Sequence, residues 1–253
     1  MKNIKIHGIT YGDENFKSSR DKAYISLKKY TDAAYLFTET DLNEYKDKID
    51  SKILYPGARG GGHWIFKPIF LKYILNNIPD GEAVIWMDAG NECVADIRIL
   101  ADIAANHEGF CLFQQVHKNS HYTKRDCFYY MNNDSLSYYN SRQCDASMQL
   151  YIKNEKTLKF IDEYLHFCSD YRIVTDRPNE CNLPNLEGFI DHRHDQSILT
   201  NLVVTYDLDT FIQPSQWYSL SWNTDDRAQF LNTNERIQSE RYSTLFNHHR
   251  ERY

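Results

Sequence analysis

Hydrophobic positions near the start of the chain predict a strand, a loop and a helix. Residues 3–10 (NIKIHGIT) alternate between apolar and polar side chains, as in a half-buried strand, and the alternation stops at Tyr11-Gly12-Asp13. Apolar residues with helical spacing follow this turn: Phe16, Ala23, Tyr24, Leu27 and Tyr30. The chain therefore opens with a β-loop-α unit.

Strand-like and helical patterns continue to alternate further along the chain. Short apolar runs at 33–42, 82–87 and 110–115 are typical of buried strands, whereas 69–78 and the segment after Asn154 have the apolar spacing of helices. We therefore expect an α/β fold, with a mixed, mostly parallel sheet that is flanked by helices.

The apolar pattern thins from Pro214 onward. No internal repeat and no Pro/Ser-rich linker divides the 253 residues, and a hydrophobic content of 42% is enough for one large core. We expect one main domain over residues 1–213, with residues 214–253 as a C-terminal extension packed on that domain.

Charge and segment composition exclude several classes of partner. A net charge of -6 and an isoelectric point near 5.9 oppose long-range attraction to nucleic acid or to anionic membranes. No segment reaches the roughly 18 apolar residues of a membrane-spanning helix, and the N-terminus has no apolar signal core. We expect a cytoplasmic protein without a transmembrane segment or a nucleic-acid partner. Its six cysteines lie singly along the chain, which indicates reduced thiols and not a zinc site.

A triple glycine at 60–62 precedes Pro68, a residue that is tolerated in the first turn of a helix. We therefore expect a helix N-terminus at or just after 63–67. Free backbone N–H groups collect at such an end, and Arg59 and Lys67 would add positive charge suited to a phosphate. The alternative is a flexible loop that leads into a core helix, since these glycines match no Walker or dinucleotide fingerprint.

The apolar strand at 82–87 ends abruptly at Asp88, which Ala89 and Gly90 follow. In open α/β sheets, ligands bind beyond the carboxyl ends of the strands, where loops present polar groups on a rigid support. A carboxylate at that edge can hold Mg²⁺ or Mn²⁺ and, through the ion, a diphosphate. Alternatively, Asp88 caps the turn that follows it.

A third cluster of polar side chains stands just before a helical apolar run at 188–202. It consists of Asp191, His192, Arg193, His194, Asp195 and Gln196. Such a density of titratable groups would be costly in a core, so the cluster favours a functional site, although a capped surface loop explains it too. A histidine beside aspartates is either a metal ligand or a hydrogen-bonded imidazole. A charged turn is expected at 122–126, where the alternative is an acceptor-binding loop.

Taken together, these landmarks resemble the nucleotide-diphospho-sugar glycosyltransferases of the GT-A fold. The strand and carboxylate of IWMDAG look like the D-x-D strand of that family, with Gly90 in place of the second aspartate. DASMQLYIKN (145–154) and HDQSILTNL (194–202) have the order of two further segments found in the retaining branch similar to family 8. The resemblance covers roughly Lys2 to Val204. WIFKP also looks like a segment of transferase-like proteins encoded in surface-polysaccharide loci.

The resemblance implies a glycosyltransferase that moves a sugar from a nucleotide-diphosphate donor to a glycan or glycoconjugate acceptor. The nucleotide would lie near Thr10 and Tyr11, and the diphosphate between Lys67 or Arg59 and the loop of Asp88, Ala89 and Gly90. Asp195 and Gln196 would bind the donor sugar. In an inverting enzyme, Asp195 or Asp191 would instead be the general base.

The resemblance also implies a Mn²⁺ or Mg²⁺ ion, with Asp88 and His194 as its candidate ligands. Gly90 removes one expected metal ligand, so the sequence leaves open whether the reaction uses a metal. The C-terminal histidine motif of the family is not evident, although His248 and His249 stand near the chain end.

Two other classes of function remain open at this point. A metal-dependent hydrolase would use the same aspartates and histidines to activate water. A non-catalytic carbohydrate-binding protein would keep the fold and the aromatic residues without binding a nucleotide, and Gly90 in place of an acid is compatible with it.

Overall fold

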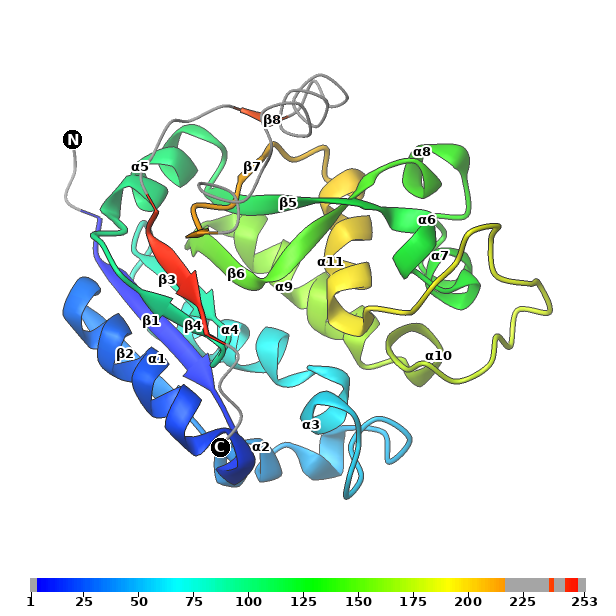
Figure 1. Ribbon diagram of the computed structural model, residues 1–253, viewed down its shortest axis with the longest axis horizontal. Helices are drawn as coiled ribbons and strands as arrows, with labels where there is room; N and C mark the ends of the chain where they lie inside the picture. The colour runs from blue at the N-terminus through cyan, green and yellow to red at the C-terminus, as the bar shows by residue number, and fades with distance from the viewer. Residues whose placement is uncertain (1–3, 217–236, 239–243, 250–253) are drawn as a thin grey trace.

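The computed structural model describes residues 4–216, 237–238 and 244–249. Its centre is a seven-stranded sheet in the order β2-β1-β3-β6-β5-β7-β8 (Figure 1). The strands are β1 (Ile6–Tyr11), β2 (Ala33–Phe37), β3 (Ala83–Met87), β5 (Phe110–Lys118), β6 (Arg142–Ile152), β7 (Thr210–Ile212) and β8 (Ile237–Gln238). A second sheet pairs β4 (Asn91–Cys93) with β9 (Phe246–His248).

The main sheet is mixed. β1 is parallel to β2 and β3, and β7 is parallel to β5 and β8, whereas β6 is antiparallel to both of its neighbours, β3 and β5. This arrangement confirms the predicted α/β class with a mixed, mostly parallel sheet. The predicted strands at 3–10, 82–87 and 110–115 correspond to β1, β3 and β5.

Helices cover both faces of the sheet. The longer ones are α1 (Lys17–Tyr30), α4 (Phe66–Asn77), α5 (Arg98–Asn106), α9 (Glu155–Cys168) and α11 (His194–Thr205). Shorter helices are α2 (Glu39–Asn43), α3 (Gly60–His63), α6 (Asn119–Tyr122), α7 (Arg125–Tyr130), α8 (Leu136–Tyr139) and α10 (Tyr171–Val174), with 3-10 turns η1 (Glu14–Phe16) and η2 (Lys46–Lys48).

The core consists of two apolar layers that β3 separates. Val84 and Trp86 point to a layer built with α4, α9 and α11, whereas Ile85 and Met87 point to a layer built with α1 and α5. Alternate residues of a strand face opposite sides, so a strand that is buried on both faces is apolar throughout, as β3 is. The sheet is therefore a rigid support for the loops at its edge.

Two predicted elements differ from the structure. The strand predicted at 33–42 ends at Phe37, because Thr38 and Asp41 form a capping box that starts α2. The charged turn predicted at 122–126 is instead a buried polar segment, in which Lys124 is 3% exposed and Asp126 is 0% exposed.

The described residues of the C-terminal part return to the main body of the protein. β9 pairs antiparallel with β4, and the backbone N–H groups of Leu245 and Phe246 both donate to the carbonyl of Pro214. Leu245 and Phe246 are buried. None of the helices among the described residues has the length and apolarity that crossing a membrane requires.

Candidate active site

The triple glycine forms a left-handed turn. Five consecutive residues have positive φ: Gly60 at 57°, Gly61 at 59°, Gly62 at 98°, His63 at 54° and Trp64 at 62°. Residues with a Cβ rarely adopt this conformation, which costs them about 1–2 kcal/mol each. Glycine therefore relieves strain at three of the five positions, and the remaining strain lies in His63 and Trp64. Strain of this kind is frequent at functional sites.

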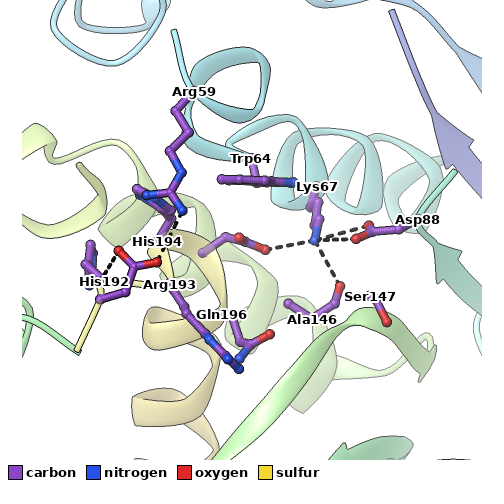
Figure 2. A pocket seen from close by; sticks show the side chains of 12 residues that line it. Arg59, Trp64, Lys67, Asp88, Ala146, Ser147, His192, Arg193, His194 and Gln196 are labelled. Carbon is purple, nitrogen blue, oxygen red and sulfur yellow. Dashed lines mark hydrogen bonds and ion pairs between the residues drawn. The ribbon is translucent and has the colours of Figure 1, made fainter. Parts of the chain in front are cut away.

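The turn delivers the chain into α4, whose second residue is Lys67. This lysine is 2% exposed, and its ammonium nitrogen lies 3.1 Å from Oδ1 of Asp88, 3.1 Å from Oδ2 of Asp195 and 3.1 Å from the carbonyl oxygen of Ala146. Burial alone would lower the pKa of Lys67, but the charges of Asp195 and Asp88 outweigh burial and raise that pKa. Figure 2 shows the ammonium with its interactions to Asp88 and Ala146.

Asp88 follows the last residue of β3 and is fixed from several sides. The indole Nε1 of Trp86 donates to its Oδ1 at 2.7 Å, and its backbone N–H donates to the carbonyl of Ser147 on β6 at 2.9 Å. The side chain remains 30% exposed. Asp88 therefore presents a fixed carboxylate at the sheet edge, as the sequence predicted.

Asp195 is the second residue of α11 and is 3% exposed. Its Oδ2 accepts a hydrogen bond of 3.2 Å from the hydroxyl of Tyr164 on α9 and contacts Lys67. Burial raises the pKa of Asp195 to about 6 against the opposing charge of Lys67, and the nearby Asp88 carboxylate adds to the rise. One ammonium faces two carboxylates here, so its charge can neutralise only one of them.

Gln196 and Arg193 belong to a polar network under the start of α11. The amide nitrogen of Gln196 donates to Gln143 at 2.8 Å, and a guanidinium N–H of Arg193 donates to Gln115 at 2.8 Å. Gln115 in turn donates to Asp145 at 3.1 Å. This network holds Gln196 and Arg193 at one side of the site.

His194 belongs to a cluster of imidazoles behind the turn. Its ring centre lies 5.0 Å from that of His63, 5.2 Å from that of His192 and 5.3 Å from that of Trp64. Its Nδ1 is bonded to the carbonyl of Val174 at 2.8 Å, which leaves Nε2 buried without a hydrogen-bond partner among the described residues. Burial lowers the pKa of His194 to about 4, so the ring is neutral near pH 7.

Arg59 and Asp191 lie at the rim of the site, with the Arg59 guanidinium near His194 (Figure 2). The Arg59 guanidinium lies 3.2 Å from Asp191 and 3.4 Å from Asp176, and the three side chains are nearly half exposed. Exposed ion pairs of this kind exchange readily with water or with a ligand. Arg59 is therefore available to an anionic group at the entrance.

A cavity of about 230 Å³ joins these groups into one site (Figure 2). Its lining comes from the left-handed turn and α4 (Arg59, Trp64, Lys67), the β3 edge (Asp88), β6 (Ala146, Ser147) and the start of α11 with the preceding residues (Asp191, His192, Arg193, His194, Asp195, Gln196). The three sequence landmarks, far apart along the chain, meet in this cavity.

Four other predicted site residues, Thr10, Tyr11, Ala89 and Gly90, do not line the cavity. Thr10 and Tyr11 end β1 and are buried, and the Tyr11 ring stacks on Phe66 with 3.9 Å between ring centres. Ala89 is 8% exposed, and the carbonyl of Gly90 accepts a hydrogen bond of 2.8 Å from the backbone N–H of His249. This return of the chain end places His248 and His249 beside the Asp88 loop.

The side chains expected to hold a metal do not form a metal site as they stand. No group of three or more His, Cys, Asp and Glu side chains in the described ranges could hold an ion. Oδ1 of Asp88 is engaged by Trp86 and Lys67, Gly90 supplies no carboxylate, and Nδ1 of His194 is engaged by Val174. Mn²⁺ and Mg²⁺ require several oxygen ligands around one point. These residues do not fit that requirement.

Sequence reasoning missed the residue that fixes the approach to α11. Asp126 is fully buried, and its carboxylate accepts hydrogen bonds of 2.8–3.0 Å from the backbone N–H groups of Glu180 and Cys181. Lys124 donates to the carbonyl of Arg177 at 3.1 Å. Together they anchor the long segment 176–193, which has no regular structure and leads directly to Asp195. No sequence signal distinguishes a buried aspartate of this kind from one in an exposed turn.

Known proteins resemble this chain in fold but not in sequence. The sequence matches no protein-family model and no curated protein. Solved structures match nearly the whole chain. The apo form of mouse xyloside xylosyltransferase 1 is 11% identical, with a TM-score of 0.51, and 98% of each chain is covered. The apo WbbM bifunctional glycosyltransferase is 10% identical, with a TM-score of 0.53, and the match covers 98% of this chain and 46% of WbbM.

Identities near 10% carry information about the arrangement of the backbone and not about substrates. Both matching structures are glycosyltransferases by name, and each match covers 98% of this chain. The chain has a GT-A-like α/β glycosyltransferase fold.

Proposed function

We propose that the protein is a glycosyltransferase that moves a sugar from a nucleotide-diphosphate donor to a hydroxyl of a glycan or glycoconjugate acceptor. The observation that carries the proposal is the Lys67 bridge between Asp88 and Asp195, in a cavity at the carboxyl end of β3 on a GT-A-like fold. Synthesis of a surface polysaccharide is the biological setting that we propose, from the WIFKP resemblance.

The cavity suits a sugar because its polar groups are fixed before the ligand arrives. Asp195 and Gln196 hold their positions through Lys67, Tyr164 and Gln143. A carboxylate accepts hydrogen bonds from sugar hydroxyls, and an amide group both accepts and donates them. Groups that are already held in place bind a ligand without the cost of being ordered. We assign Asp195 and Gln196 to the donor sugar, with Asp195 or Asp191 as the general base if the reaction inverts the anomeric carbon.

We propose a role for Lys67 that differs from the phosphate contact expected from the sequence. Its buried ammonium is committed to two carboxylates, so we assign it to holding Asp88 and Asp195 in place and not to direct contact with phosphate. Arg59 and Arg193 line the cavity and carry the positive charge that a departing diphosphate needs. Thr10, Tyr11 and the loop of Asp88 to Gly90 would then border the nucleotide.

Two alternatives have less support. A metal-dependent hydrolase needs a cluster of metal ligands, and the described residues contain none. A non-catalytic carbohydrate-binding protein gains little from a buried charged triad, because such an arrangement is costly to maintain.

The test is thermal unfolding against sugar nucleotides and nucleoside diphosphates, with and without Mn²⁺ or Mg²⁺, followed by detection of released nucleoside diphosphate. We expect one donor class to stabilise the protein by about 2.7 kcal/mol at 100 times its dissociation constant. Asp195→Asn should reduce turnover by about 100-fold or more. Asp80→Asn is the control, because the Asp80 side chain is 86% exposed. A folded sample that responds to no sugar nucleotide would contradict the proposal.

A further inference from the structure

A second hollow of about 370 Å³ lies along α4, and it shares no lining residue with the candidate active site. We call it the α4 groove. One wall of the groove consists of Lys72, Tyr73 and Asn76 of α4. The other lining residues include Tyr45 and Lys48, at and beside η2, and Leu165 of α9. A volume above about 300 Å³ falls in the range of sites for small ligands.

The groove follows from the spacing of residues on α4. Ile69, Lys72, Tyr73 and Asn76 recur at helical intervals and therefore share one face of the helix. Ile69 is 5% exposed and forms part of an apolar floor, whereas Tyr73 is 48% exposed. The opposite face of α4 carries Lys67 into the active site, so one helix has side chains in both hollows.

Two tyrosine rings in the groove each contact a phenylalanine ring, of which Phe37 is partly buried and Phe70 is buried. Tyr73 meets Phe37 edge to face, with 6.1 Å between ring centres, and Tyr45 meets Phe70 in the same way at 6.2 Å. A ring that is already held in place loses little conformational freedom on binding. The apolar C–H face of a sugar ring stacks on an aromatic ring of this kind.

The charge of the lining differs from that of the active site. Among the described residues, the charged side chains that line the groove are those of Lys48 and Lys72, and no carboxylate lines it, whereas three aspartates line the active-site cavity. Lys72 pairs with Asp162 at 2.7 Å, but both side chains are exposed by 40% or more, and such pairs contribute little. In a chain with a net charge of -6, this lining is a local site for an anion.

We propose that the α4 groove binds an anionic oligosaccharide, with a sugar ring on Tyr73 and its acidic groups on Lys48 and Lys72. The proposed binding does not depend on sugar transfer, and it applies whichever reaction the active-site cavity catalyses. In a transferase, it would retain a length of acidic acceptor chain and raise the effective concentration of the end that reacts.

The experiment compares binding of trigalacturonate and maltotriose, which have the same number of rings and differ in carboxylates, by saturation-transfer NMR titration. We expect trigalacturonate to bind more tightly and its affinity to fall with added salt. Tyr73→Ala should weaken binding about fivefold or more. The double variant Lys48→Gln and Lys72→Gln should weaken trigalacturonate binding as much as Tyr73→Ala does, and it should remove most of the salt dependence of that binding.

Matched variants make each outcome decisive. Tyr129→Ala removes a tyrosine on α7 that is 49% exposed, close to the 48% of Tyr73, and Lys159→Gln removes an exposed lysine of α9 outside the groove. Both should bind trigalacturonate like the wild type. Absence of trigalacturonate binding, equal affinity for maltotriose, or equal losses in Tyr73→Ala and Tyr129→Ala would each overturn the proposal. A loss in Asp195→Asn as large as that in Tyr73→Ala would place the ligand in the active-site cavity instead.

Discussion

The ammonium nitrogen of Lys67 and Oδ2 of Asp195 lie 3.1 Å apart, and their side chains are 3% and 4% exposed. A buried ion pair of this kind depends on both partners, since either charge alone would be buried without compensation. Here the same ammonium also serves Asp88. The stability of the site is therefore tied to a single lysine.

Replacing that lysine should be costly. We expect Lys67→Met to lower the free energy of unfolding by about 3–5 kcal/mol, because it leaves two carboxylates close together without their cation. Urea unfolding measures the change. Lys72→Met is the control on the same helix, where the ion pair with Asp162 is exposed, and its cost should stay within about 0.5 kcal/mol. Equal costs for the two variants would mean that the bridge does not stabilise the fold.

The raised pKa of Asp195 predicts a pH dependence with a definite sign. The folded state holds a proton on this carboxyl up to about pH 6, whereas the unfolded chain loses it near pH 3.8. The folded state therefore binds more protons between these values, and the contribution of Asp195 to stability falls as pH rises from about 4 to 6. Above that window the contribution is constant.

The measurement is the difference in unfolding free energy between the wild type and Asp195→Asn, taken at several pH values by denaturant titration. Between pH 4 and 6, the unfolding free energy of the wild type should fall relative to that of Asp195→Asn by at most about 3 kcal/mol. Above pH 6 the difference should be constant. A difference that stays flat through this window would show that Asp195 titrates at its ordinary pKa.

From the geometry of the left-handed turn, we expect alanine substitutions at Gly57, Gly60 and Gly61 to destabilise the protein to different degrees. Gly57 and Gly61 have positive φ without a steric barrier, since a Cβ at Gly57 meets nothing within 4 Å and one at Gly61 lies 3.5 Å from its nearest neighbour. A Cβ at Gly60 would lie 2.4 Å from the indole of Trp64. Alanine at Gly57 or Gly61 should cost about 1–2 kcal/mol, and alanine at Gly60 should cost more and displace Trp64.

Unfolding free energies rank the three variants, and the indole N–H resonance of Trp64, assigned with Trp64→Phe, reports its displacement. Gly57→Ala is the control, because Gly57 lies outside the turn and alanine there would have the same backbone strain from positive φ without a steric clash. The steric argument fails if Gly60→Ala costs no more than Gly57→Ala and leaves the Trp64 resonance in place.

The turn also illustrates what the sequence could and could not predict. Periodicity located β1, β3, β5 and α4 because each buries a regular apolar face, and the residue after β3 was expected at the sheet edge for the same reason. A run of glycines permits positive φ without requiring it. The sequence correctly predicted a helix start at or just after 63–67, where α4 begins at Phe66, but it did not reveal the left-handed turn that places the rings of His63 and Trp64 beside the ring of His194.

Long-range polar contacts account for most of what the sequence did not reveal. Lys67 was expected beside a phosphate, because nothing near it in the sequence shows that Asp88 and Asp195 lie around its ammonium. Tyr11 was expected near a nucleotide, and its ring stacks on Phe66 in the core. β6 contains both apolar and polar residues, so its hydrophobic pattern does not reveal that it pairs with β3 and β5 in the assembled sheet.

Asp126 gives the last prediction, because its carboxylate holds the segment that leads to Asp195. Three backbone contacts from Glu180 and Cys181 converge on it in a fully buried position. Asp126→Ala should cost about 3 kcal/mol, since the N–H groups lose a charged acceptor and Lys124 loses a counter-ion 3.7 Å away. Hydrogen exchange at the amides of Glu180 and Cys181 should accelerate at least about tenfold.

Glu180→Ala is the matched control, because it removes a loop side chain and leaves the backbone N–H groups on Asp126. That variant removes the hydrogen bond that the hydroxyl of Tyr171 donates to Glu180, which does not involve Asp126, so its amide exchange should stay close to that of the wild type. If the segment sets the position of Asp195, donor binding should weaken in Asp126→Ala and not in Glu180→Ala. Faster exchange with unchanged donor binding would separate the anchor from the active site, and unchanged exchange would show that Asp126 does not anchor the segment.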